Sequence, residues 1–214
     1  AKRYRGENVQ LLFCDDDRDY RPGWARALIE EAERHPDHAV ALAGWDIAGL
    51  TQRSSFSHPR HKRRSRTWDL AYRASRLRQI MRGQGNAKLA HKPPRRIIAH
   101  PGFADIFEGY GGVIVQPDFF DAPSYDIPPE AFHVDDVWLS GMLNRRGIGI
   151  WLASNQFEPK TTDADRKCAL FRHRVAEQGR HELDAAAIQL LRRRCNIWGG
   201  ADVMLNANIA DEQI

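Results

Sequence analysis

The feature that most constrains the fold of this 214-residue chain is an apolar segment that leads directly into three adjacent aspartates. Residues 9–14 (VQLLFC) predict a short buried strand, and the aspartates at positions 15–17 follow it without a spacer. Pro22 suits the first turn of a helix that ends before Pro36, and residues 39–43 predict a second strand. Strand, acidic turn, helix and strand in this order predict an α/β fold.

The rest of the chain continues this alternation of helices and strands. We expect further helices at 67–81, from about 135 to a glycine cap at Gly147, and at 182–194, and strands at 97–99, 111–115 and 148–152. These elements predict an α/β sheet. Residues 1–155 are expected to form the core, with a basic segment at 51–96, and residues 156–214 a polar, helical extension that packs on the same domain.

The composition suits a soluble globular protein rather than a membrane-spanning one. Apolar residues make up 42% of the chain, the mean hydropathy is −0.59, and no run approaches the roughly 18 apolar residues of a membrane span. Cys14, Cys168 and Cys195 show no zinc-site spacing and are too few and too scattered for a disulfide framework. We therefore expect a cytoplasmic protein, free in solution or peripheral to a membrane.

The charges are strongly segregated along the chain. Residues 51–100 contain 14 Lys and Arg and one acidic residue, whereas residues 1–50 and 101–150 are both net acidic. This division suggests a cleft with a cation near one wall and an anion near the other. The most basic stretch, 58–66 (HPRHKRRSR), has three interpretations: a solvated mobile loop, a nucleic-acid patch, or a lip that attracts an anionic acceptor or membrane surface.

The first acidic cluster, Asp15, Asp16 and Asp17, has the residue types of a divalent-cation site. Ligands in open α/β sheets bind outside the carboxyl ends of strands, where this cluster is expected. Adjacent carboxylates repel one another unless a cation or protons neutralise them, and Mg²⁺ or Mn²⁺ takes carboxylate oxygens together with substrate phosphates. The alternative is an acidic turn that caps the following helix.

The second cluster, Asp135 and Asp136, is expected at the start of a helix. Aspartate is a favoured N-cap residue, and the helix dipole stabilises negative charge in the first turn, so capping alone explains the pair. Two adjacent carboxylates point in different directions, however. One of them could project into a cleft and act as a general base.

Three stretches resemble motifs of GT-A glycosyltransferases, close to their family 2-like and exostosin-like branches. Residues 11–17 (LLFCDDD) followed by 20–24 (YRPGW) resemble the strand, DXD motif and helix of these enzymes. Residues 133–141 (HVDDVWLSG) resemble their second acidic motif, and residues 109–112 (GYGG) resemble the glycine-rich loop beside the acceptor. The resemblance covers residues 1–155, with the motifs in the expected order, and it implies a GT-A-like mixed sheet flanked by helices.

The resemblance implies a role for each motif. Asp15 and Asp16 would face a nucleotide-diphosphate sugar, and Asp17, with Asp15, would hold Mn²⁺ or Mg²⁺. Asp136, with Asp135 beside it, would be the catalytic base. Gly111 and Gly112 would border a saccharide or other hydroxyl acceptor, possibly an anionic one. The implied reaction is sugar transfer with inversion, and nucleic acid is not an expected partner.

Two departures from the family pattern and one open question accompany these expectations. Only 14 residues precede the acidic triplet, where such enzymes have a strand–helix–strand unit that binds the nucleotide base, so we expect this chain to lack that unit. The Gln-x-x-Arg-Trp motif of processive synthases is also missing, which favours a single transfer. His173 and His181 are either surface residues or candidates for a third metal ligand.

Two other classes of protein share part of this pattern. Phosphatases of the haloacid-dehalogenase type also place Asp-x-Asp after an apolar strand, but the position two residues beyond the second aspartate, usually Thr or Val, is Asp19 here. A non-catalytic polyanion-binding module would account for the basic segment alone.

Overall fold

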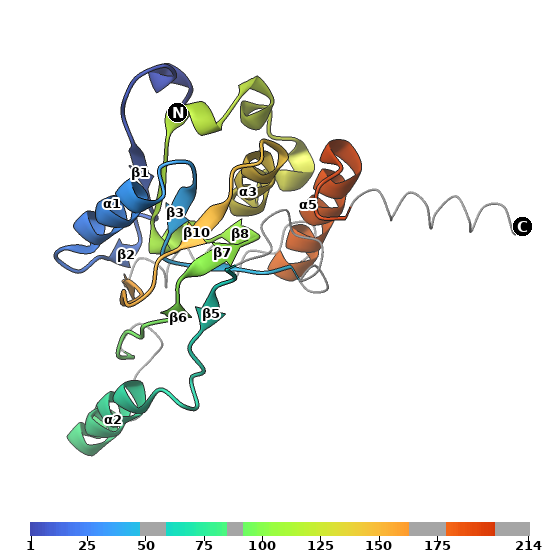
Figure 1. Cartoon of the computed structure of the whole chain (residues 1–214). Helices are drawn as coiled ribbons and strands as arrows, with labels where there is room; N and C mark the ends of the chain where they lie inside the picture. Colours follow the sequence, from blue (N-terminus) through green and yellow to red (C-terminus); the bar gives the residue numbers. More distant parts are fainter. Residues whose placement is uncertain (48–58, 85–91, 163–178, 200–214) are drawn as a thin grey trace, which may run out of the picture.

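The computed structural model describes residues 1–47, 59–84, 92–162 and 179–199, which contain a five-stranded mixed sheet and four α-helices (Figure 1). The sheet order is β1 (Leu11–Phe13), β9 (Val113–Val115), β3 (Ala39–Ala41), β10 (Ile150–Leu152) and β7 (Gly102–Ala104). β3 and β10 run parallel, and every other neighbouring pair is antiparallel. The expected α/β class with a mixed sheet is confirmed.

Helices cover both faces of this sheet because the strand residues alternate between two apolar layers. Val40, Ile114 and Trp151 pack on one face against α1 (Trp24–Arg34), which contributes Leu28 and Ala32. The residues before and after each of these three strand positions pack on the other face, where α3 (Asp135–Arg145) contributes Leu143.

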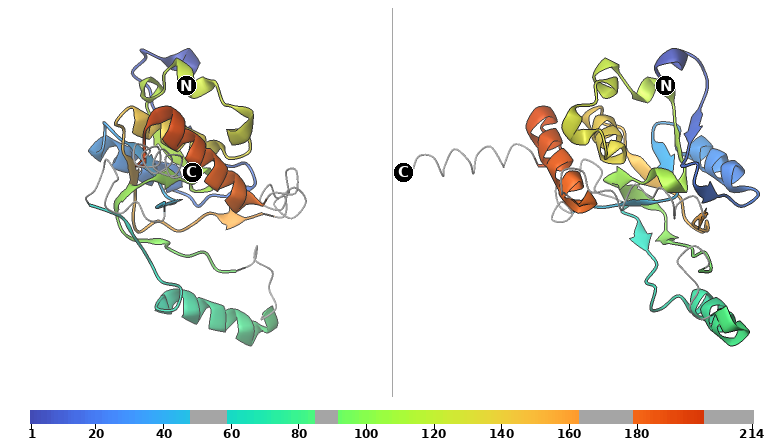
Figure 2. Two further views of the ribbon diagram at one scale, coloured as in Figure 1. Left: turned by 90° about the vertical axis from the view of Figure 1, so that its right-hand side faces the viewer. Right: turned by 180° about the vertical axis from the view of Figure 1, so that it is seen from behind.

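The fourth helix, α5 (Arg180–Cys195), packs on α3 (Figures 1 and 2). Gly141 permits this contact, because a Cβ atom at that position would lie 2.6 Å from a methyl group of Leu191. Strand β11 (Lys160–Thr161) pairs with β2 (Arg18–Asp19), directly after the acidic triplet. Segments from beyond residue 155 therefore lie against the part of the chain that carries both acidic clusters.

The remaining elements are short strands and turns around the main sheet. β4 (Gly44–Trp45) pairs with β8 (Ile106–Phe107), and β5 (Lys62–Arg63) pairs with β6 (Ile98–His100). α2 (Leu70–Gln79) continues into a π-helical turn, η2 (Ile80–Gln84). The described 3-10 helices are η1 (Lys2–Tyr4), η4 (Gly109–Gly111), η5 (Pro117–Phe119), η6 (Ala122–Tyr125) and η7 (Pro129–Ala131). No helix in the described ranges combines the length and the apolar character needed to cross a bilayer.

The first strand differs from the expectation of a buried strand. β1 lies at the edge of the sheet, with β9 as its neighbour among the described residues, and Leu12 is 37% exposed. An apolar run does not by itself distinguish a central strand from an edge strand.

The prediction of a solvated loop at 58–66 is wrong for two of its residues. His58 lies outside the described residues. Arg60 donates to the buried carboxylate of Asp105 over 3.1 Å and pairs with Asp46, and His61 is buried beside them. Ion pairs with Asp46 and Asp105 therefore hold Arg60 against the core. Lys62 and Arg63 remain exposed.

Candidate functional site

The acidic triplet lies where β1 leaves the sheet, next to the glycine-rich turn η4. The Tyr20 hydroxyl is 3.1 Å from the carbonyl oxygen of Asp15 and 3.1 Å from that of Tyr110. Tyr20 also packs on Trp24, with 4.1 Å between the ring centroids. One aromatic side chain therefore ties the triplet, the start of α1 and the glycine-rich turn together.

The two glycines assigned to acceptor binding have packing roles in this turn. Gly112 is buried with φ +92°, and a Cβ atom there would lie 2.2 Å from the Trp24 ring. The indole N–H of Trp24 donates to the carbonyl oxygen of Gly111 over 2.8 Å. A Cβ atom on Gly111 would lie 2.9 Å from the backbone nitrogen of Ala43. Close packing therefore accounts for both glycines, and Gly111 also borders a pocket.

The two acidic clusters, far apart in the sequence, meet at Gly109. A Cβ atom on Gly109 would lie 3.1 Å from Oδ1 of Asp136 and 3.4 Å from Oδ1 of Asp15. The backbone N–H of Gly109 donates to the Asp136 carboxylate, with 3.2 Å to each oxygen. A side chain at position 109 would fill the space that these carboxylates share, so glycine leaves room there for another group.

Asp136 has the properties of a group that exchanges protons near neutral pH. Burial, followed by repulsion from Asp135, raises the pKa of Asp136 from 3.8 to about 7. The Gly109 N–H and the Arg180 guanidinium, whose Nη2 is 3.8 Å from Oδ2, oppose this rise. Both the protonated and the charged forms are therefore populated at physiological pH.

Neither aspartate caps the helix, contrary to the capping interpretation, but both lie where the helix dipole favours negative charge. The N-cap residue of α3 is Val134, no side chain of the described residues caps the helix, and both aspartates lie within its first turn. Asp135 is exposed, and its charge raises the pKa values of Asp136 and Asp15. The pair therefore belongs to the same electrostatic cluster as the triplet.

The three residues of the triplet have different environments. Asp16 is exposed in the turn. Asp15 faces the cluster, where partial burial and then repulsion from Asp17 raise its pKa, against the attraction of Arg18. Oδ1 of Asp17 is buried and forms an ion pair with Nε of Arg18, 3.3 Å away, and the Asp17 backbone carbonyl accepts from the Thr162 hydroxyl over 2.8 Å.

These residues fit a cation held partly by the protein and partly by a substrate. Among the described residues, no group of three or more His, Cys, Asp or Glu side chains is arranged to hold a metal ion. Mg²⁺ is commonly held by one or two carboxylates together with substrate phosphates and water. The mutual repulsion of Asp15 and Asp17 suits that mode of binding, in which a cation would compete with Arg18 for Oδ1 of Asp17.

Of the two histidines considered as third ligands, His181 is among the described residues and does not join this cluster. His173 lies outside the described residues. His181 is exposed on α5, where it lies close enough to Asp184 to affect the pKa of that carboxyl.

Three further charged residues near the site were not assigned a role from the sequence. Arg180 begins α5 and reaches Asp136, and Arg18 pairs with Asp17 above the Tyr110 ring. Glu108 has a buried Oε2 without a hydrogen-bond partner, and burial raises its pKa against the attraction of Arg63 and Arg180. Arg18 and Glu108 adjoin the motifs and could have been noticed, whereas only the packing of α5 brings Arg180 to the site.

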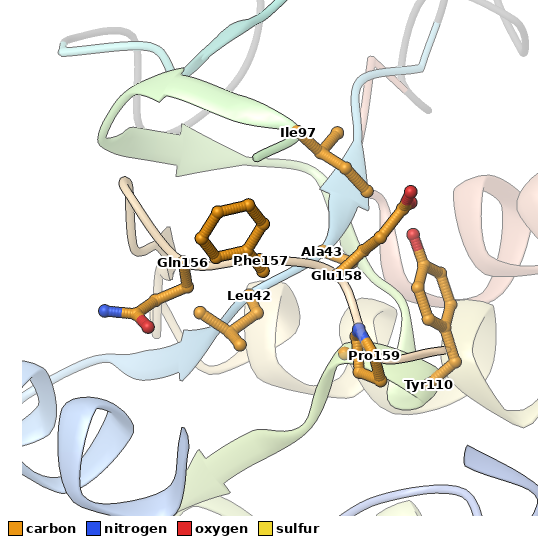
Figure 3. Close-up of a pocket in the computed structure, with 9 residues that line it drawn as sticks. Leu42, Ala43, Ile97, Tyr110, Gln156, Phe157, Glu158 and Pro159 are labelled. Carbon is orange, nitrogen blue, oxygen red and sulfur yellow. The ribbon is translucent and has the colours of Figure 1, made fainter. Parts of the chain in front are cut away.

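A shallow pocket, open to solvent, lies beside the glycine-rich turn and has room for about one water molecule (Figure 3). Its walls include Leu42, Ile97 and Phe157, and its polar groups include the Tyr110 hydroxyl and the Glu158 carboxylate, which point the same way in Figure 3. Burial and the neighbouring Glu108 and Glu158 charges raise the pKa of Tyr110, so its hydroxyl stays protonated and can donate. In this structure the pocket is too small to enclose a sugar ring.

Comparison of the chain with models of known protein families, with curated proteins and with solved structures finds no match.

Proposed function

We propose that this chain carries the catalytic part of a glycosyltransferase that moves a sugar from a nucleotide-diphosphate donor to an acceptor hydroxyl. The observation that carries the proposal is the meeting of Asp136 and Asp15 at Gly109, beside a carboxylate triplet at a sheet edge. Motifs that resemble those of GT-A enzymes, found far apart in the sequence, thereby form one site. Within the described residues β1 pairs on one side only, with β9, so its other side offers a place where a nucleotide-binding unit could pair.

Asp136 is the proposed base. Its pKa of about 7 lets it accept a proton near neutral pH, and the Gly109 N–H orients its carboxylate. The acceptor hydroxyl loses its proton to Asp136 as its oxygen bonds to the anomeric carbon. The bond from that carbon to the diphosphate oxygen breaks, and the diphosphate leaves with the electron pair. Attack on the side opposite the leaving group inverts the configuration.

The donor diphosphate is assigned to the triplet side of the site. Asp15 and Asp17 would hold Mn²⁺ or Mg²⁺, which supplies Lewis-acid stabilisation of a leaving diphosphate when bound. Asp16 is exposed and free to face the donor. Arg18 and Arg180 add positive charge beside the carboxylates. The pocket between Gly111 and Glu158 is the proposed acceptor side.

The test is a transfer assay with a panel of nucleotide-diphosphate sugars, saccharide acceptors and Mn²⁺, in which released nucleoside diphosphate is measured. Asp136→Asn keeps the shape and the Gly109 hydrogen bond but cannot act as a base, so kcat should fall about 10²–10⁴-fold. Wild-type kcat should rise with pH through about 7, as Asp136 loses its proton.

Asp135→Asn is the matched control. It removes the repulsion that raises the pKa of Asp136, so it should keep most of the activity and move the pH–rate profile to lower pH. Equal and mild losses in both variants would contradict the assignment of the base. Release of inorganic phosphate from a simple phosphoester without sugar transfer would favour a phosphatase instead, and salt-sensitive polyanion binding without turnover would favour a binding module.

A further inference from the structure

Helix α2 and the residues next to it present large apolar side chains to solvent. Ten large hydrophobic side chains are exposed in the described residues, and five of them lie between positions 68 and 81. They are Trp68 (81% exposed), Leu70 (73%), Leu77 (57%), Ile80 (52%) and Met81 (78%). Soluble monomers rarely expose so many large apolar side chains in one place, and such a patch usually marks an interaction site.

The exposed side chains fall on one side of the helix. Leu70, Ala74 and Leu77 are spaced four and three residues apart, which places them in one stripe, and all three are exposed. Tyr72, on the opposite side, is partly covered. A surface helix normally turns its apolar side toward the protein, so the orientation of α2 is the reverse of the usual one.

The base of α2 is anchored to the protein by polar contacts. Asp69 is buried, accepts from the backbone N–H of Tyr72 over 3.1 Å, and lies 3.5 Å from Nε of Arg95. The Arg95 guanidinium also lies over the Tyr72 ring, 5.3 Å from its centroid. These contacts set which side of the helix faces outward, while the helix itself projects from the body in every view (Figures 1 and 2).

Arginines flank the apolar stripe. Arg73, Arg78 and Arg82 are exposed on α2 and the turn that follows it. The acidic residue of this region, Asp69, is paired with Arg95 and does not offset them. Arginine buries its aliphatic stem along an apolar surface while its guanidinium stays at the polar boundary. The occupant of this surface must therefore be both apolar and anionic.

We propose that α2, with Trp68 at its base, docks this protein on an anionic lipid bilayer. The apolar stripe enters the boundary between headgroups and acyl chains, the arginines contact anionic headgroups, and Trp68 lies at the level of the headgroups. A nucleic acid would pair with the arginines but would leave the leucine and methionine side chains in water. The inference does not depend on the proposed chemistry.

The test uses the whole chain with two kinds of vesicle, one of phosphatidylcholine and one that also contains phosphatidylglycerol. Co-sedimentation should show binding to the phosphatidylglycerol vesicles and much weaker binding to phosphatidylcholine alone. Leu77→Glu should weaken binding about tenfold or more, because it removes an apolar side chain that the bilayer would bury. Arg73→Gln and Arg78→Gln should each weaken it roughly fivefold.

Matched controls come from α1, which carries an exposed isoleucine and an exposed arginine outside the proposed surface. Ile29→Glu and Arg26→Gln should bind vesicles like wild type. Brominated lipid should quench Trp68 fluorescence, and Trp68→Phe should remove that quenching while keeping most of the binding. All these side chains are exposed, so the variants should unfold at the wild-type temperature.

Several results would overturn the proposal. Equal vesicle binding by wild type and Leu77→Glu would remove α2 from the contact. Equal binding to both kinds of vesicle would contradict recognition of anionic headgroups by the arginines. Self-association that Leu77→Glu abolishes, in a chain that does not bind vesicles, would assign the surface to a second copy. Nucleic-acid binding without vesicle binding would show that the arginines act alone.

Discussion

Replacing Asp136 by asparagine should stabilise the protein at neutral pH while it removes activity. The pKa of Asp136 is about 7 in the folded protein and 3.8 for an ordinary aspartate, so the folded state binds its proton more tightly than the unfolded chain does. Its contribution to stability is therefore fully present below pH 3.8 and is lost as the pH rises through about 7. Keeping this carboxylate charged above pH 7 costs folding free energy.

The size of this cost follows from the difference between the two pKa values. About three pH units at about 1.4 kcal/mol each amount to at most about 4 kcal/mol at pH 8. Asparagine keeps an oxygen that can accept the Gly109 N–H and carries no charge. Asp136→Asn should therefore match wild type near pH 4 and exceed its free energy of unfolding by about 2–4 kcal/mol at pH 8.

Urea unfolding of both proteins at several pH values between 4 and 8 measures this difference. Asp121→Asn is a control of opposite sign. Although burial opposes it, hydrogen bonds from Arg145 and Ser124 lower the pKa of Asp121, so its contribution is present above pH 3.8 and is lost as the pH falls. Asp121→Asn should therefore be less stable than wild type at pH 7. If Asp136→Asn were no more stable than wild type at pH 8, the charged Asp136 carboxylate would not cost folding free energy, and the explanation by burial and repulsion would be refuted.

Two further predictions concern the glycine-rich turn and the triplet. Gly112→Ala should lower the free energy of unfolding by about 2–5 kcal/mol, because it combines a positive φ with a Cβ atom 2.2 Å from the Trp24 ring. Gly147→Ala, with φ +71° and no atom within 4 Å, should cost only about 1 kcal/mol in the same denaturation assay, and equal losses would show that the clash is relieved. Asp17→Ala should abolish Mn²⁺ binding in calorimetry while Asp19→Ala, an exposed neighbour in β2, keeps it; retained binding in Asp17→Ala would exclude Asp17 as a ligand.

Local patterns in the sequence were enough to predict the class of fold and most of its elements. The strand before the triplet, the helix between Pro22 and Pro36 and the helix that follows residue 134 are all observed, with ends that differ by a few residues. Helical and strand periodicities are properties of neighbouring residues, so one sequence reveals them. Bringing Asp15 and Asp136 into one proposed site depended on the resemblance, because no local pattern relates two clusters so distant in the chain.

Tertiary contacts decided the features that depend on what lies beside a residue. The edge position of β1, the half-buried ion pairs of Arg60 and the approach of Arg180 to Asp136 each depend on a partner distant in sequence. The outward apolar side of α2 is the clearest case. Its sequence predicts an amphipathic helix, but which side meets the protein is decided by the anchoring of Asp69 and Tyr72 to Arg95. Periodicity determines that a helix has two unlike sides, whereas the energy of packing against distant residues determines which side is buried.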